Sequence, residues 1–189
     1  MKLSDLMSMV TDKARQRMLE ESVGKDYPEE EQAEIARVVG LAALKFADLS
    51  NHRSSDYIFD IDRFTRFEGK TGPYVVYTAV RIKSIFRRVG EPEGVRFAAT
   101  LADREREVLL LTAQLADIVQ AAYDASTPHQ LAEQAFVLCQ SFNRFYQECN
   151  ILHEQDQERK QSWLSTCTLV LRQLELLSDL LGMEIPERM

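Results

Sequence analysis

Apolar side chains recur every three or four residues along most of this 189-residue chain. The stretch "LSDLMSMVTDKARQRMLEES", for example, places six apolar side chains between Leu3 and Met18 on one side of a helix. Gly, Pro and Ser residues cluster in the breaks between such stretches, where they favour turns. The pattern predicts helices over about 3–21, 28–49, 73–89, 100–125, 129–149 and 155–181.

The stretch "YIFDIDRF" departs from the helical spacing because its apolar and acidic residues alternate. Tyr57, Phe59 and Ile61 fall on one side, which predicts an extended segment. Asp60 and Asp62 fall on the other side, and nothing nearby completes an acid–base pair, so we expect both to be structural. With only 7 Gly and 5 Pro, the chain is poor in turns. The sequence therefore predicts an all-α fold, a helical bundle with a short extended insert.

Charge is distributed unevenly along the chain. The net charge is −7, which argues against a protein that coats nucleic acid without specificity. Residues 70–96, however, carry six basic side chains against two acidic ones and so have a net charge of +4, while the segments on both sides are acidic. A local basic patch on an acidic body suits a specific anion site, although a solvated helix face would have the same composition.

The predicted helix at 73–89 has two distinct faces. Five apolar residues from Val75 to Val89 form one narrow stripe, which we expect to face the core. A second face, more than 90° away, carries Tyr74, Tyr77, Arg81 and Arg88. Tyrosines one turn apart beside an arginine form a platform on which bases stack. The alternative is that the tyrosines pack under neighbouring helices with their hydroxyls hydrogen-bonded. The pattern of one helix leaves both interpretations open.

The sequence offers no constellation typical of a complete small enzyme. Its three cysteines are scattered, its three histidines are isolated, and neither type forms a metal-binding spacing. An odd number of scattered cysteines is typical of reduced thiols in a cytoplasmic protein. The longest apolar run, "VVGLAAL", is far too short to span a bilayer. We therefore expect a cytoplasmic protein with no catalytic residues, no metal site and no membrane segment.

Several motifs resemble those of the arginyl-tRNA synthetase family. The stretch "LAALKFADLSNHRSSDYIFDIDRFTRFEGKTGPYVVYTAVRIKSIFRR" is similar to that family's K-[YF]-x-D-L-S, D-Y-x-F-D-x-D-R and F-E-G-x-T-G-P-Y-x-x-Y-x-x-x-R patterns. "FNRFYQECNIL" resembles its penultimate bundle helix, and "LLGMEIPERM" resembles its C-terminus. The resemblance runs in the family's order from Lys2 onward. Near the last helix, "RKQSWLSTCTLVLRQL" departs from the family's usual R-L-x-L run.

The resemblance implies the C-terminal part of a class I ligase that attaches arginine to tRNA. Residues 1–66 would be connecting helices from the end of the catalytic half, and residues 67–189 a DALR-type anticodon-binding helical bundle. The family's H-[IV]-G-H motif is not in this sequence. We therefore expect no catalysis and no cofactor in this chain alone, whereas the full-length family enzyme uses ATP and Mg²⁺. The implied partner is the tRNA of the arginine isoacceptors, bound by a monomer.

The resemblance also implies which residues bind the anticodon loop. In the family, the tyrosines of P-Y-x-x-Y, the following arginine and the final methionine line a base pocket; here these are Tyr74, Tyr77, Arg81 and Met189. We add Arg88 and Lys70, basic residues of the same segment, to the predicted site. The glycine-rich turn before the helix would let the RNA backbone approach closely. The alternative function is a stand-alone helical bundle that binds another protein through its Leu- and Met-rich N-terminal helices.

Overall fold

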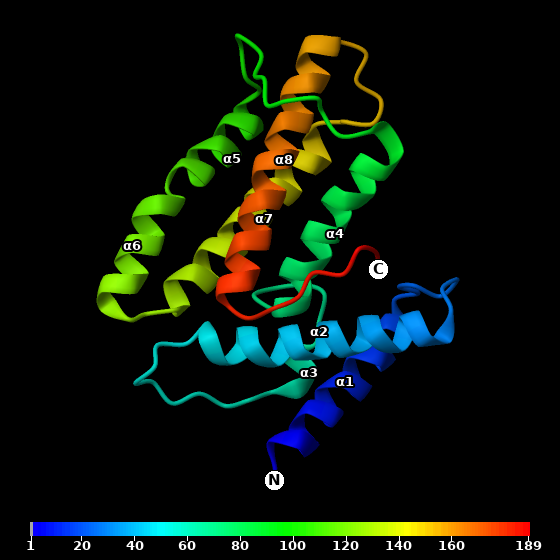
Figure 1. The fold of residues 1–189 in the computed structure, drawn as a ribbon, viewed down its shortest axis with the longest axis vertical. Helices are drawn as coiled ribbons and strands as arrows, with labels where there is room; N and C mark the ends of the chain where they lie inside the picture. Colours follow the sequence, from blue (N-terminus) through cyan, green and yellow to red (C-terminus); the bar gives the residue numbers. More distant parts are fainter. Residues whose placement is uncertain (1) are drawn as a thin grey trace.

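Eight helices and their connections make up the computed structural model, which describes residues 2–189 (Figure 1). Within these residues the structure has no strand, so the predicted all-α fold is confirmed. The helices are α1 (Leu3–Glu20), α2 (Glu29–Leu49), α3 (Ile61–Phe64), α4 (Gly72–Val89), α5 (Asp103–Ala113), α6 (Leu115–Ala125), α7 (His129–Glu148) and α8 (Gln157–Leu180).

The first two helices form a pair that lies across the base of the other helices (Figure 1). Their packing is close because α2 carries Gly40 at the crossing point, where a Cβ would lie 2.8 Å from the Thr11 Cα. Val10 and Ala14 of α1 and Val39 of α2 are fully buried in this pair. Burial of this apolar stripe supplies the main stabilisation that holds the two helices together.

The bundle itself is built from α4, α5, α7 and α8, with α6 packed against α7. Each helix contributes apolar side chains at helical spacing to one continuous core, into which α2 inserts Phe46. The largest fully buried side chains of this core include Ile82, Ile85, Leu138, Phe142, Phe145, Leu174 and Leu177. The predicted apolar stripe of α4 therefore does face the core.

The single helix predicted over 100–125 is wrong, because the structure has two helices that meet at Gln114. Side chains from other helices donate hydrogen bonds to the backbone carbonyl groups just before this point. Gln134 of α7 donates to the Leu111 carbonyl at 3.0 Å, and Gln173 of α8 donates to the Thr112 carbonyl at 2.7 Å. These bonds replace part of the helical hydrogen-bond ladder, so the chain bends here.

The predicted extended segment is wrong over its second half. Ile61–Phe64 form a helical turn, and residues 56–60 are neither helix nor strand. The Asp60 side chain caps this turn by accepting a 3.1 Å hydrogen bond from the Arg63 backbone N–H. Asp62 pairs with Lys13 of α1 at 2.7 Å. Both carboxylates therefore have structural roles, as we expected. The alternating pattern predicted the wrong structure for Ile61–Phe64 because Asp60 is a helix-capping residue within that short run.

The start of α4 fixes where the candidate site lies. Thr71 caps the helix by accepting a 3.2 Å hydrogen bond from the Tyr74 backbone N–H, and Pro73 lies in the first turn. Gly72 lies directly on α2, where a Cβ would overlap the Ala42 carbonyl group. This turn therefore packs α4 tightly against α2, and the absence of a side chain at Gly72 permits that contact.

After α8, residues 181–189 run back between α4 and α2, so that the last residue lies near the middle of the molecule (Figure 1). Gly182 begins this segment with a φ of +67°, a conformation that glycine adopts without strain. Lys45 of α2 donates to the Gly182 carbonyl. Lys83 of α4 pairs with Glu187 at 2.7 Å. The segment is thus held to both helices by side chains.

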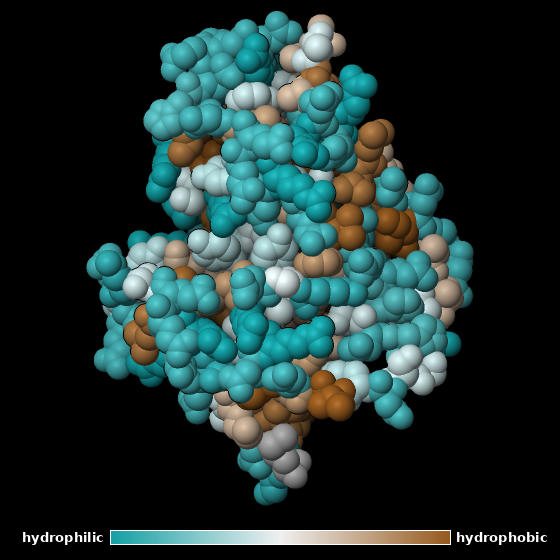
Figure 2. All heavy atoms as spheres, turned by 180° about the vertical axis from the view of Figure 1, so that it is seen from behind, coloured by the Kyte–Doolittle hydropathy of each residue, from teal (hydrophilic) through white to brown (hydrophobic). Residues whose placement is uncertain are grey.

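The rear surface is largely hydrophilic, with apolar residues gathered mainly at one side over α5 to α7 and in smaller groups lower on the molecule (Figure 2). Leu110 of α5 is 60% exposed. None of the helices within residues 2–189 is long and apolar enough to cross a lipid bilayer.

Candidate nucleic-acid interface

A pocket of about 360 Å³ opens where the second half of α4 meets α7, the α1–α2 connection and the last residue. The second face of α4 forms its floor, and aromatic or apolar side chains from three other segments form its walls. The side chains that line it are Tyr27, Tyr77, Val80, Arg81, Ser84, Ile85, Arg87, Arg88, Tyr146, Leu152 and Met189.

Arg81 lies between two aromatic rings of this pocket. Its guanidinium carbon is 5.0 Å from the centre of the Tyr77 ring, one turn earlier on α4, and 5.4 Å from the centre of the Tyr146 ring on α7. Both distances are within the range of a cation–π interaction. The guanidinium also donates to the side-chain oxygen of Asn143. Arg81 is therefore held in one orientation, with several of its five N–H donors left for a ligand.

Asn143 of α7 forms hydrogen bonds with two of the predicted site residues on α4, Tyr74 and Arg81. Its side-chain N–H group donates to the Tyr74 hydroxyl at 2.9 Å and to the Thr78 hydroxyl at 3.2 Å, while its oxygen accepts from Arg81. Burial raises the pKa of Tyr74 above its ordinary value. The network fixes the side-chain orientation of Arg81 from behind the pocket.

Tyr77 lies beside Arg81 on the floor of the pocket. Its ring lies 5.9 Å from that of Phe67, a buried residue in the turn before α4. Tyr27 and Met189 pack beside Tyr77 in the same apolar cluster, which also receives Met18 of α1. A partly buried aromatic ring next to a methionine side chain presents a flat, apolar surface to the pocket.

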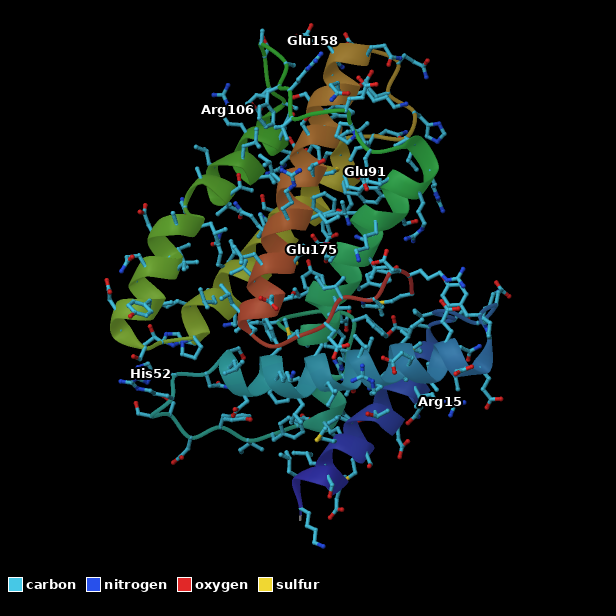
Figure 3. All side chains as sticks on the ribbon, in the orientation of Figure 1. Arg15, His52, Glu91, Arg106, Glu158 and Glu175 are labelled. Carbon is cyan, nitrogen blue, oxygen red and sulfur yellow. The ribbon has the colours of Figure 1, made fainter. Side chains whose placement is uncertain are left out.

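The electrostatics of the pocket are one-sided. Three arginines line it, and no aspartate or glutamate is among its described lining residues. The neighbouring groove between α4 and α8 is different, since its basic side chains face an equal number of carboxylates; two of these, Glu91 and Glu175, are labelled in Figure 3. On a chain of net charge −7, the aromatic pocket is thus a local positive site.

Of the six predicted site residues, four line the pocket: Tyr77, Arg81, Arg88 and Met189. The other two do not. Tyr74 places its ring 5.9 Å from that of Phe136 on α7 and its hydroxyl on Asn143, which is the buried arrangement that the sequence left open as the alternative. Lys70 forms an ion pair with Glu133 of α7. The assignment of all six residues to RNA binding stays a prediction.

Sequence reasoning missed three residues that shape this site: Tyr27, Asn143 and Tyr146. Asn143 and Tyr146 both lie in the "FNRFY" stretch and are three residues apart, so they share one face of α7. That shared face was a usable signal. Tyr27 lies in a connection between helices, where no periodic pattern shows which way a side chain points.

The cysteines take no part in the site. All three are buried, unpaired thiols, and burial raises the pKa of Cys139 to about 12 and that of Cys149 to about 11. Neutral, inaccessible thiols are poor nucleophiles. Within residues 2–189, no group of three or more His, Cys, Asp or Glu side chains is placed to hold a metal ion.

Two protein-family models match the chain. Residues 75–189 match the DALR anticodon binding domain, and residues 1–61 match the catalytic domain of class I tRNA synthetases (R). The first match runs from Val75 in the first turn of α4 to the last residue, and so covers most of the pocket. The second covers α1 and α2, including Tyr27.

Relatives and solved structures agree with these matches. The chain is 45% identical to an arginine–tRNA ligase of Maricaulis maris and 41% identical to one of Alkaliphilus oremlandii, in each case over its whole length and 32% of the relative. It superimposes on the Thermus thermophilus arginyl-tRNA synthetase with a TM-score of 0.90 at 29% identity, again over all of this chain and 32% of that one. The chain thus spans about a third of these proteins. It belongs to the DALR anticodon-binding domain family, in the form that arginyl-tRNA synthetases carry.

Proposed function

We propose that this chain is the anticodon-binding part of an arginine–tRNA ligase, and that its pocket receives an unstacked base from the anticodon loop of arginine tRNA. One observation carries the proposal: a pocket on an acidic chain is lined by three tyrosines and three arginines, with no aspartate or glutamate among its described lining residues. Proteins that read single-stranded RNA loops combine aromatic side chains, on which bases stack, with basic side chains that contact phosphates and base edges.

Each pocket residue has a role that follows from its surroundings. The Tyr77 ring offers a stacking surface, and Met189 beside it closes that end of the pocket. Arg81, whose orientation Asn143 fixes, would donate hydrogen bonds to a base edge. Arg88 is exposed at the rim and would contact a phosphate.

Tyr74 and Lys70 have a different place in this proposal. Because the Tyr74 hydroxyl lies on Asn143, Tyr74 would act by supporting Arg81 and not by touching the base. Lys70 would be a peripheral charge, since it is already paired with Glu133. We place the division between connecting helices and anticodon-binding bundle at residue 67, in the turn that precedes α4.

The ligase reaction of the relatives is a property of proteins about three times as long. We infer that attachment of arginine, with ATP and Mg²⁺, requires the whole ligase, and we assign none of its steps to residues 2–189. We also propose that the chain acts in the cytoplasm and is a monomer. Sedimentation equilibrium should then give a mass near 21.7 kDa.

A competition experiment tests the proposal. A fluorescently labelled anticodon stem-loop of an arginine tRNA is bound to the chain and displaced by unlabelled stem-loops with the same stem. The arginine loop should compete at least about tenfold better than the loop of a tRNA for another amino acid, because a mismatched base leaves polar groups of the site unpaired. Equal competition, or no binding of either RNA, would refute the proposal.

The alternative of a protein-interaction module has one supporting observation. Leu3, Met9 and Leu19 of α1 are 68%, 49% and 61% exposed, and such apolar side chains can contact another polypeptide. Membership of an RNA-binding family favours the tRNA proposal over this alternative.

A further inference from the structure

The pocket wall formed by Met189 is attached to the first third of the chain. Arg188 makes a bidentate ion pair with Glu31 of α2, with N–O distances of 2.6 and 2.7 Å. The same guanidinium lies 4.3 Å from the centre of the Tyr27 ring. The Tyr27 hydroxyl donates to a main-chain oxygen of Met189 at 3.4 Å. Two consecutive residues at the pocket are thus fastened by two residues of the α1–α2 region.

We propose that Tyr27, Glu31 and Arg188 are positioning residues for the base pocket: they hold Met189 against Tyr77, so that its side chain forms a fixed wall before RNA arrives. This inference rests on the proposed function of the pocket. It adds residues that no comparison of the bundle alone would include, since Tyr27 and Glu31 lie outside residues 75–189.

The local structure shows why side-chain contacts are needed to fix Met189. Residues 183–189 contain no helix or strand, so no backbone ladder fixes Met189. The other side-chain contacts of this segment end earlier: Arg37 pairs with Glu184 at 3.0 Å, and Lys83 and Arg87 contact Glu187. Beyond Glu187, the contacts that orient the chain within residues 2–189 are those of Arg188 and Tyr27 and apolar packing.

The geometry of the ion pair suits this role. A bidentate arginine–carboxylate pair fixes the plane of the guanidinium as well as its position, which a lysine would not do. The hydrogen bond from Arg188 lowers the pKa of the Glu31 carboxyl, which favours its charged form. The fixed guanidinium also stacks on the Tyr27 ring, so the Arg188 side chain is held at two points. The backbone direction from Arg188 to Met189 is thereby restricted. A wall ordered in advance reduces the entropy lost when the base binds.

The test uses Glu31→Gln, Arg188→Leu and Tyr27→Ala in the full chain. The matched control is Glu34→Gln, which lies one turn further along α2 and removes a carboxylate paired with Arg37 instead. Each protein is labelled with ¹³C in its methionine methyl groups, and the Met189 signal among the six methionines is assigned by its loss in Met189→Leu. The rings of Tyr27 and Tyr77 should displace this signal from the position of a solvent-exposed methionine.

In the free proteins, we expect the Met189 methyl signal to move toward the solvent-exposed position in the three test variants and to stay in place in Glu34→Gln. Affinity for the arginine anticodon stem-loop should fall about threefold to fivefold in Glu31→Gln and less than twofold in the control. Melting temperatures should be similar in Glu31→Gln and Glu34→Gln, because both lose one exposed ion pair.

The outcomes separate the two proposals. An unchanged Met189 signal in Glu31→Gln and Arg188→Leu would overturn the positioning role, whatever the RNA result. A moved signal with unchanged affinity would show that the wall is held but does not serve RNA binding, and would also overturn it. If the unmodified chain binds no RNA, the proposed function fails, and the methyl signal alone decides whether Met189 is held by these residues.

Discussion

Replacing Arg81 with methionine removes the central charge of the pocket and keeps most of its side-chain volume. Arg81→Met loses the hydrogen bond to Asn143 and the cation–π contacts to Tyr77 and Tyr146. It also removes every donor that the guanidinium directs into the pocket. The variant should therefore lose RNA affinity to a much greater extent than it loses stability.

Both magnitudes follow from the contacts. A hydrogen bond to a charged group contributes about 1.5–3 kcal/mol, which corresponds to about a tenfold to 150-fold loss of affinity. The lost internal contacts are partly exposed, and the methionine sulfur regains favourable contacts with the two rings, so the net cost in folding is about 1 kcal/mol. For a chain of this length, that cost lowers the melting temperature by about 2–4 °C.

Fluorescence anisotropy with the labelled arginine stem-loop measures the first quantity, and thermal circular dichroism the second. Arg104→Met is the matched control, because Arg104 is also an arginine with two partners, Glu107 and Glu148, but lies on α5 outside the pocket. If Arg81 contacts a phosphate, the slope of log affinity against log salt should fall by about 0.7; contact with a base edge should leave it nearly unchanged. Equal effects of the two variants on affinity would refute the reasoning, as would loss of cooperative unfolding in Arg81→Met.

Three further predictions address the support of the site. Gly72→Ala should lower the free energy of unfolding by about 1–3 kcal/mol or more in urea titrations, because its Cβ would overlap the Ala42 carbonyl group of α2. Lys70→Met should change stem-loop affinity less than about twofold, since the lysine is paired with Glu133 at the molecular surface; a tenfold loss would place it in the interface. Burial raises the pKa of the Cys139 thiol from 9.0 to about 12, so the folded chain keeps this proton above pH 9, where the unfolded chain loses it. The free energy of unfolding should therefore fall as the pH rises above 9, and Cys139→Ala should make that fall shallower.

The helices could be predicted from the sequence because their signals are local. The 3.6-residue period of α2 and the Thr71–Pro73 cap of α4 lie within a few residues of the structure that they specify. The bend at Gln114 could not be predicted, since it depends on Gln134 and Gln173, which lie 23 and 61 residues away from the carbonyl groups that they bind.

The same limit applies to the site. The two faces of α4 identified Tyr77 and Arg81 as candidates, because one helix carries both. Whether a tyrosine on that face is open or covered depends on α7, and α7 covers Tyr74 with Phe136 and Asn143. Tyr27 enters the pocket from a connection before α2, where its place is set by contacts with residues about 160 positions later.

The central claim, that a base of the anticodon loop enters this pocket, is tested most directly by photo-crosslinking. Arginine anticodon stem-loops that each carry one photoreactive base in the loop are bound to the chain and irradiated, and the crosslinked residue is identified by mass spectrometry. At least one loop position should crosslink to Tyr77, Tyr146 or Met189, while a photoreactive base in the stem should not. Crosslinks confined to surfaces outside the pocket, such as α5 and α6, would contradict the account.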